Sequence, residues 1–245
     1  MLMQLLMMQN ADAAFPSGGF AFSNGVEGLG ALRRPLTGPD LTDALTASLR
    51  HRWAGADRVA LIGAFRASDD HGALSRIDAA VEAATLAEPM RVGSKRNGRA
   101  LLVTHTRLES PGAAALHKAL SDGRLLGHLP VIQGALWCGL GLGEAEAVLI
   151  SAYQAAASMA TAAIRLGHIG AIDAQRSLSA ALEVIADIVR QPMEQGVTPG
   201  SSKNEGCTGV VPRQSPSPVI LTNFTPFIEI AAMRLAGADL RLFAN

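Results

Sequence analysis

Residues 147–164 read AVLISAYQAAASMATAAI, a stretch without a single Asp, Glu, Lys or Arg. It lies inside a longer segment, 144–166, that contains neither Gly nor Pro and therefore predicts the longest helix of the chain. The length approaches what a membrane-spanning helix requires, but Ala, Ser, Thr and Gln154 make the stretch less apolar than a Leu-rich span. We therefore expect a helix buried at the centre of a bundle, with a membrane component using residues 125–164 as the alternative.

The composition of the whole chain favours the same architecture. Hydrophobic residues make up 49% of the 245 residues, enough for a large core, whereas aromatic residues make up only 4%. Alanine supplies much of the apolar content, and small side chains let helices approach closely. Lys plus Arg equals Asp plus Glu at 21 each, so the charge balance gives no reason to expect nucleic-acid binding.

Helical periodicity recurs along the chain. Thr37 and Asp40 have the pattern of a helix start, and an apolar residue follows at every fourth position, at Leu41, Leu45, Leu49 and Trp53. The glycine-rich piece 127–143 is poor helix material, and the β-branched cluster at 219–222 is isolated. Further helices are expected near 56–67, 71–87, 91–109, 113–121 and 173–190. The prediction is an all-α fold, a single-domain helical bundle.

Three parts of the chain differ in composition. Residues 1–194 are expected to form the all-α core. Residues 195–225 are rich in Pro, Gly, Ser and Thr and lack helical periodicity, which predicts a flexible segment. Residues 226–245 have the pattern of a short helix and tail. We expect this last part to order on a partner, with docking on its own bundle as the alternative.

The N-terminal residues 1–8, MLMQLLMM, resemble a signal peptide only superficially. No Lys or Arg precedes the apolar run, so we interpret it as the first, partly buried helix of the protein. The two cysteines, Cys138 and Cys207, are far apart and have neither CxxC spacing nor a nearby histidine in a zinc-site pattern. These features predict a protein of the reducing cytoplasm.

Sequence patterns typical of catalysis or metal binding are few. Residues 93–98, GSKRNG, have the spacing of a phosphate loop but lack the Lys and Ser/Thr that should follow. No GxSxG elbow occurs, and the six histidines are not spaced as metal ligands. Ser17 is expected to be a turn or capping residue. We therefore predict no catalytic, metal or cofactor site, and keep a small soluble hydrolase using Ser17 as the alternative function.

The segment 12–27, DAAFPSGGFAFSNGVE, carries a distinctive pattern of aromatic, Pro and Gly residues. It resembles the N-terminal signature of the urease accessory protein UreF family, LPxGGF or LPxGAF followed by a Ser and Gly-Leu-Glu. Phe15 and Val26 stand where the family usually has Leu. The resemblance assigns a first group of motif residues: Phe15, Pro16, Ser17, Gly18, Gly19, Phe20 and Glu27.

Three later segments resemble further motifs of the same family, in the same order. Residues 89–102 are similar to ELRxGSxxxGxxLL, although Pro89-Met90 precede Arg91 where the family has Glu. Residues 163–175 are similar to RLGxxG…Q and include Arg165, Gly167 and Gln175. Residues 226–243 resemble PxxDIxxMRHE…RLF, but Leu235-Ala236 replace its His-Glu. The motif and anchor residues of this last segment are Phe227, Ile228, Ile230, Met233, Arg234, Arg241 and Phe243.

The resemblance implies an all-α helper protein without an active site of its own. In this family the protein dimerises and binds a UreD/UreH-type accessory protein. That complex recruits the GTPase UreG and acts on apo-urease so that nickel enters its active site. Nickel and GTP then belong to the partner proteins, and this chain is expected to hold no cofactor.

Residues 15–20 have a structural interpretation that does not depend on the resemblance. Pro16 stiffens a turn, whereas Gly18 and Gly19 permit backbone angles or close approaches that a Cβ atom would forbid. The flanking aromatic rings are expected to anchor the turn in the helical core. Partner contact by the same rings is the second role that we expect of this motif.

Overall fold

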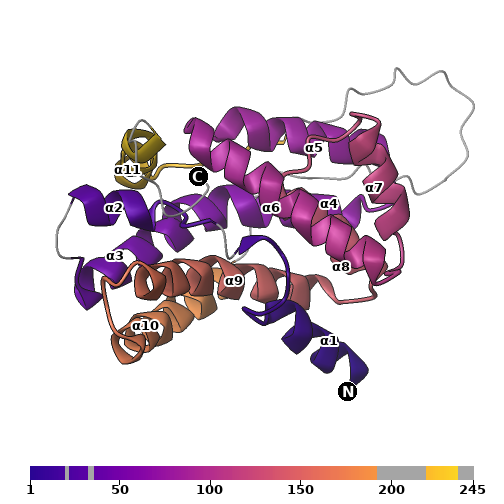
Figure 1. Ribbon diagram of the computed structural model, residues 1–245. Helices are drawn as coiled ribbons and strands as arrows, with labels where there is room; N and C mark the ends of the chain where they lie inside the picture. The colour runs from indigo at the N-terminus through magenta and orange to yellow at the C-terminus, as the bar shows by residue number, and fades with distance from the viewer. Residues whose placement is uncertain (20–21, 33–35, 192–218, 237–245) are drawn as a thin grey trace, which may run out of the picture.

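The computed structural model describes residues 1–19, 22–32, 36–191 and 219–236, and these residues contain helices and loops but no strand. Figure 1 shows the helices gathered into one bundle, with α1 projecting from it. The predicted all-α fold is confirmed. The helices are α1 (Leu2–Ala11), α2 (Val26–Leu32), α3 (Gly38–Ser48), the π-helix η2 (Leu49–Asp57), α4 (Arg58–Arg66), α5 (His71–Ala84), α6 (Glu88–Arg107), α7 (Ala113–Ser121), α8 (Leu129–Gly139), α9 (Glu144–Arg165), α10 (Ala171–Arg190) and α11 (Pro226–Ala236).

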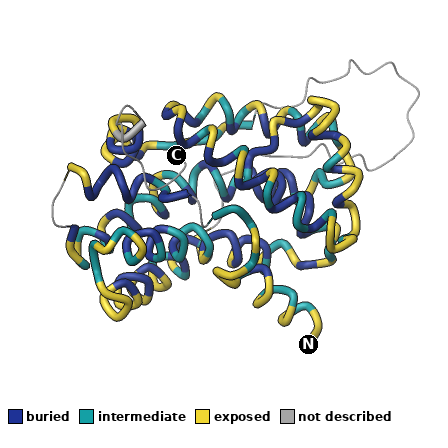
Figure 2. Tube along the Cα trace, viewed as in Figure 1, coloured by how far each residue is buried: buried dark blue, intermediate teal, exposed yellow. Residues whose placement is uncertain are grey.

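Two apolar clusters fill the bundle. The first joins α9 to α2, α3, η2, α10 and α11. The second lies among α4, α5, α6, α7 and α8. In Figure 2 the buried positions of these helices face one another, and the exposed positions lie on the outer surface. Helix α8 packs along α4, and α9 also contacts α4 and α8, so the two clusters belong to one bundle.

Helix α9 contains the stretch 147–164 and has the predicted central position. Among the described residues it is the one helix long and apolar enough to cross a membrane, but 56% of its most apolar window is buried inside the bundle. Its buried side carries small residues such as Ala152, Ala156 and Ala160, against which neighbouring helices pack. This burial is what a core helix of a bundle requires, and it favours that interpretation over the membrane alternative.

The helix start predicted at Thr37 is a complete capping box. The hydroxyl of Thr37 accepts from the N–H of Asp40, and the Asp40 carboxylate accepts from the N–H of Thr37. The row Leu41, Leu45, Leu49 and Trp53 is buried as expected. The change from α3 to the π-helix η2 within this row was not predicted.

The expectation for residues 127–143 was wrong. This piece contains α8, whose residues are largely buried between α4 and α6 despite the glycines. Gly134 explains the difference, because a Cβ atom there would overlap the carbonyl group of Leu61 on α4. Here glycine permits close packing of two helices and does not mark a break, at a helix-propensity cost that tertiary contacts offset.

The C-terminal end of the segment predicted to be flexible lies against η2. The N–H of Thr222 donates to the carbonyl oxygen of Gly55 at 3.0 Å, and the N–H of Phe224 donates to that of His51 at 2.8 Å. A wider helical turn changes which carbonyl groups find partners inside the helix. Here two carbonyl groups of η2 accept hydrogen bonds from the segment before α11. Residues 219–225 therefore form a strap that leads into α11, whereas residues 192–218 lie outside the described part.

Candidate functional site

The turn of the first family motif, at residues 15–19, packs on the second family motif, residues 89–102 of α6. The carbonyl oxygen of Pro16 accepts a hydrogen bond of 2.7 Å from the Thr104 hydroxyl of α6. Gly18 has φ +81°, and a Cβ atom there would come within 2.7 Å of the Ala100 Cβ. The buried ring of Phe22 lies against Gly93, where a Cβ atom would overlap it. The turn thus needs Gly18 for its backbone angle, and both motifs need glycine for their close contact.

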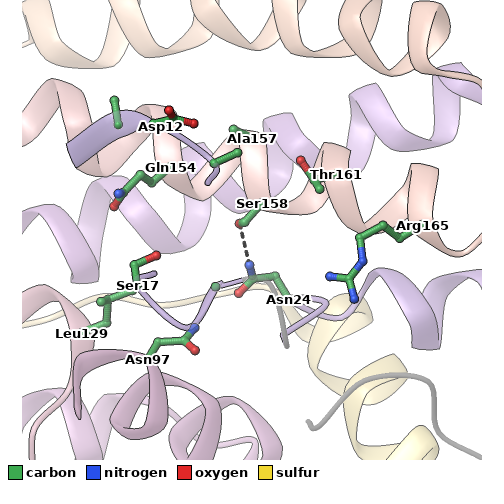
Figure 3. A pocket seen from close by; sticks show the side chains of 13 residues that line it. Asp12, Ser17, Asn24, Asn97, Leu129, Gln154, Ala157, Ser158, Thr161 and Arg165 are labelled. Atoms are coloured by element: carbon green, nitrogen blue, oxygen red, sulfur yellow. Dashed lines mark hydrogen bonds between the residues drawn. The ribbon is translucent and has the colours of Figure 1, made fainter. Parts of the chain in front are cut away.

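A cavity of about 100 Å³ lies between this turn and α9. Figure 3 shows Ser17 and Asn97 on one side of it and Arg165 at the end of α9. Asn24 crosses to α9, where its Nδ2 donates to the Ser158 hydroxyl at 2.7 Å. The cavity therefore brings together residues of three of the four motifs. Its lining comprises Ala11, Asp12, Ala13, Ser17, Gly19, Asn24, Asn97, Leu129, Gln154, Ala157, Ser158, Thr161 and Arg165.

The third family motif, residues 163–175, contacts α2, the helix that follows the turn. A Cβ atom on Gly30 of α2 would overlap the imidazole ring of His168, which belongs to the loop between α9 and α10. Gly167 precedes that histidine with φ +70°, in open space, so its role is to turn the chain. Gln175 lies on the exposed side of α10.

The fourth family motif begins in α11, and α11 also packs on α2. Ile228, Ala231 and Ala232 of α11 are buried, and α11 packs along α2. A Cβ atom on Gly28 would overlap the Ala231 carbonyl group, and one on Gly25 would come within 2.6 Å of the Ile228 side chain. We call the assembly of these four segments the motif junction: residues 16–19 and 22–30, 93–104, 165–170 and 228–232.

Docking of α11 on its own bundle was expected as the alternative to ordering on a partner, and α11 is docked in this way on α2. Ile228, predicted as a partner anchor, is therefore used inside the bundle. Phe227, Ile230 and Met233 are 49%, 46% and 47% exposed on the other side of α11, and Arg234 is exposed as well. Of the remaining predicted residues, Phe20, Arg241 and Phe243 lie outside the described part of the chain.

The first motif also has buried members. Phe15 is half-buried and packs on His105, with ring centroids 5.2 Å apart and ring planes tilted by 37°. Glu27 is buried at the start of α2, where a carboxylate interacts favourably with the helix dipole. The prediction that the aromatic rings anchor the turn in the core is confirmed for Phe15 and Phe22.

His105 belongs to a buried polar network that ties α1 to the bundle. Its Nε2 lies 3.1 Å from the Asn10 Oδ1, which also accepts a hydrogen bond of 3.1 Å from the Trp137 indole N–H. The Nδ1 lies 2.9 Å from the hydroxyl of Ser110. Burial lowers the pKa of His105 to about 4, so the ring is neutral, and its Nε2–H donates to Asn10 while Nδ1 accepts from Ser110.

A second buried network holds the start of α8. The carboxylate of Asp78, fully buried on α5, accepts from the N–H groups of Leu126, Gly127 and His128 at 2.6, 2.8 and 3.0 Å. Three otherwise unpaired backbone donors before a helix are satisfied by one side chain.

The buried ring of His128 extends this network to α6, because its Nδ1 lies 3.1 Å from the Ser94 hydroxyl. Burial lowers the pKa of His128, so the neutral ring donates from Nε2 to the Glu82 carboxylate at 2.7 Å. Burial opposes ionisation of Glu82, but hydrogen bonds from Lys95 and His128 outweigh it and lower the pKa of Glu82.

Both networks escaped sequence reasoning, because the contacts that join their helices are distant in sequence. His128 and Glu82 are 46 positions apart, and Trp137 and Asn10 are 127 positions apart. The spacing of the six histidines gave no indication that His105 and His128 are buried.

Ser17 lines the cavity, but within the described ranges no histidine or carboxylate is hydrogen bonded to it. The described residues also contain no group of three or more His, Cys, Asp or Glu side chains placed to hold a metal ion. Residues 93–98, GSKRNG, lie in the middle of α6 and not in a loop, with Ser94 and Asn97 buried. The observed chemistry of the junction is close helix packing around a small cavity that both apolar and polar side chains line.

The fold and the motif junction define a helical protein in which separated sequence motifs build one packed unit. The sequence model of the UreF family matches residues 37–182. The "Urease accessory protein UreF" of Trichodesmium erythraeum is 31% identical over 245 residues, covering 99% of this chain and 97% of that protein. "Urease accessory protein UreF 1" of Brucella melitensis is 28% identical, with 98% and 92% covered, and the Yersinia enterocolitica protein is 27% identical, with 98% and 96% covered. The chain belongs to the UreF family.

Proposed function

We propose that this chain is a urease accessory protein that acts in urease maturation as a non-catalytic scaffold. The observation that carries the proposal is the motif junction. Residues by which the chain resembles the family come from four distant segments and meet around α2 and the cavity beside α9. The glycines of the junction serve close packing, because a Cβ atom on Gly18, Gly28 or Gly30 would clash with a neighbouring segment, and this supports a structural role for the motifs.

The partners follow from the family. In this proposal the chain, as a homodimer in the cytoplasm, binds a UreD/UreH-type protein and recruits the GTPase UreG to apo-urease. Nickel and GTP are handled by these partners, and the chain has no cofactor of its own. Nucleic acid and membrane have no part in this function.

Helix α11 supports a role in protein binding. Its inner side is fixed on α2 by Ile228, Ala231 and Ala232, which orients the helix. Its outer side presents Phe227, Ile230 and Met233, three large apolar side chains at positions i, i+3 and i+6. Exposed apolar side chains in a row on a fixed helix are suited to insertion into a partner's groove.

The test is co-purification of the tagged chain with the UreD/UreH-type protein from the same source, with and without the GTPase. We expect a stable complex that recruits the GTPase. Replacing Ile230 and Met233 with Asp should abolish it, whereas the same change at the exposed Leu86 and Ile172 should not. A folded chain that captures neither protein would refute the scaffold proposal.

A further inference from the structure

The outward side of α6 carries a row of basic residues beside the motif junction. Arg96, Arg99 and Arg107 are all exposed. At 100° per residue they fall within one sector of the helix, and they span about 16 Å along its axis. The neighbouring sector of α6 holds the first motif through Ala100 and Thr104. We call the row Val92, Arg96, Arg99, Val103 and Arg107 the α6 basic face.

Its arginines differ from most other surface cations of the described chain. Arg66 binds Glu144 at 2.7 Å, Arg176 binds Asp173 at 2.7 Å, and Arg190 lies 3.6 Å from Asp187. On α6 itself, Arg91 and Lys95 share the carboxylate of Glu82 on α5. Within the described residues, by contrast, Arg96, Arg99 and Arg107 make no ion pair.

The face combines this charge with apolar surface. Val92 is 46% exposed and precedes Arg96 by one turn, and Leu108 is 56% exposed beside Arg107. The nearest acidic residues of the helix region, Glu88 and Glu109, lie at its two ends. Arginine mixed with exposed apolar side chains is typical of protein interfaces, whereas nucleic-acid surfaces are basic over a much larger area. The zero net charge of the chain also disfavours a nucleic acid.

We propose that the α6 basic face is a docking surface for an acidic segment of a partner protein of the maturation complex. The inference rests on the proposed scaffold function. These three guanidinium groups, which make no ion pair with any residue that the structure describes, fit carboxylates spaced along a helix or an extended strand, each able to accept two hydrogen bonds. Because the first motif lies on the next sector of α6, a partner bound here also lies beside the motif junction.

The test uses the full chain with Arg96, Arg99 and Arg107 replaced by Glu. The matched control replaces Arg76, Arg176 and Arg190 by Glu, three exposed arginines on α5 and α10 with the same total change in charge. Binding to the UreD/UreH-type protein and to the GTPase is measured between about 50 and about 500 mM NaCl, with circular dichroism as the folding check. A third variant replaces the three α6 arginines by Lys, which preserves their charge.

We expect the α6 variant to bind at least one of the two proteins more than about tenfold more weakly at low salt, and with a smaller salt dependence. The control should stay within about threefold of the wild type. The Lys variant keeps the charge but loses the paired hydrogen bonds, so its affinity should fall between those of the wild type and the Glu variant. If the wild type binds and the α6 variant binds equally well, the α6 proposal is overturned while the scaffold function stands. If the folded wild type binds neither protein, both proposals fail.

Discussion

Gly28 gives the sharpest prediction about the motif junction. The Gly28→Ala change adds one methyl group to α2 at the point where α11 crosses it. That Cβ would lie 2.5 Å from the carbonyl carbon of Ala231, well inside the 3.4 Å of an ordinary contact. Because the obstacle is backbone, α11 must move away by about 1 Å, and the buried side chains of α11 lose their close packing on α2.

Two opposing energies decide the outcome. Alanine gains about 1 kcal/mol over glycine in a helix interior, which would stabilise α2. Loss of the close packing of Ile228, Ala231 and Ala232 on α2 costs about 2 to 4 kcal/mol, so the loss dominates. A net loss of about 1 to 3 kcal/mol corresponds to a fall of about 5-fold to about 150-fold in the hydrogen-exchange protection of α11.

The assay is amide hydrogen exchange followed by mass spectrometry on peptides that cover α11. Gly38→Ala is the matched control, because a Cβ at Gly38 meets only the Asp173 Cβ at 3.9 Å. The control should leave α11 protection unchanged. Equal protection of α11 in wild type and Gly28→Ala would refute the conclusion that glycine is required for this helix contact.

Three further predictions concern stability. Asp78→Ala leaves three N–H groups before α8 without their acceptor, and should lower the free energy of unfolding by about 3 to 5 kcal/mol in urea titrations; a loss below about 1 kcal/mol would contradict the assigned role. Gly55→Val places a Cβ within 2.6 Å of the Thr222 carbonyl oxygen, and should detach the strap 219–225, detected as faster proteolysis before α11; unchanged proteolysis would argue against the strap. His105 has a folded pKa of about 4 against 6.5 in the unfolded chain, so the unfolded state takes up the proton first and stability falls as pH decreases from about 6.5 to about 4. The wild type should lose up to about 3 kcal/mol more than His105→Gln over this range in denaturant titrations, and equal pH dependence of the two proteins would exclude His105 as a source.

The helices with regular apolar spacing were predictable from sequence. The row from Leu41 to Trp53, the capping box at Thr37 and the long helix over 144–166 depend on contacts within a few residues, which local patterns record. Helix α8 was not predictable in this way. From the sequence, Gly134 disfavours a helix. In the structure it lets α8 approach the Leu61 backbone of α4, some seventy positions earlier in the chain.

The sequence identified residues of the candidate site but not their arrangement in space. The motifs identified Gly18, Arg165 and Ile228 separately, and nothing in their spacing indicates that they meet around α2 and α9. The roles of Asn10, His105 and Asp78 had no local signal, because each satisfies groups on other helices. Long-range hydrogen bonds of buried side chains are fixed by tertiary packing and not by the neighbouring sequence.

The measurement that tests the scaffold account most directly is urease activation in a host that carries the corresponding urease gene cluster but lacks this chain. The account predicts that such cells make inactive urease, that the wild-type chain restores nickel-dependent activity, and that the purified chain alone has no urease activity. Full urease activity in cells without the chain would contradict the account.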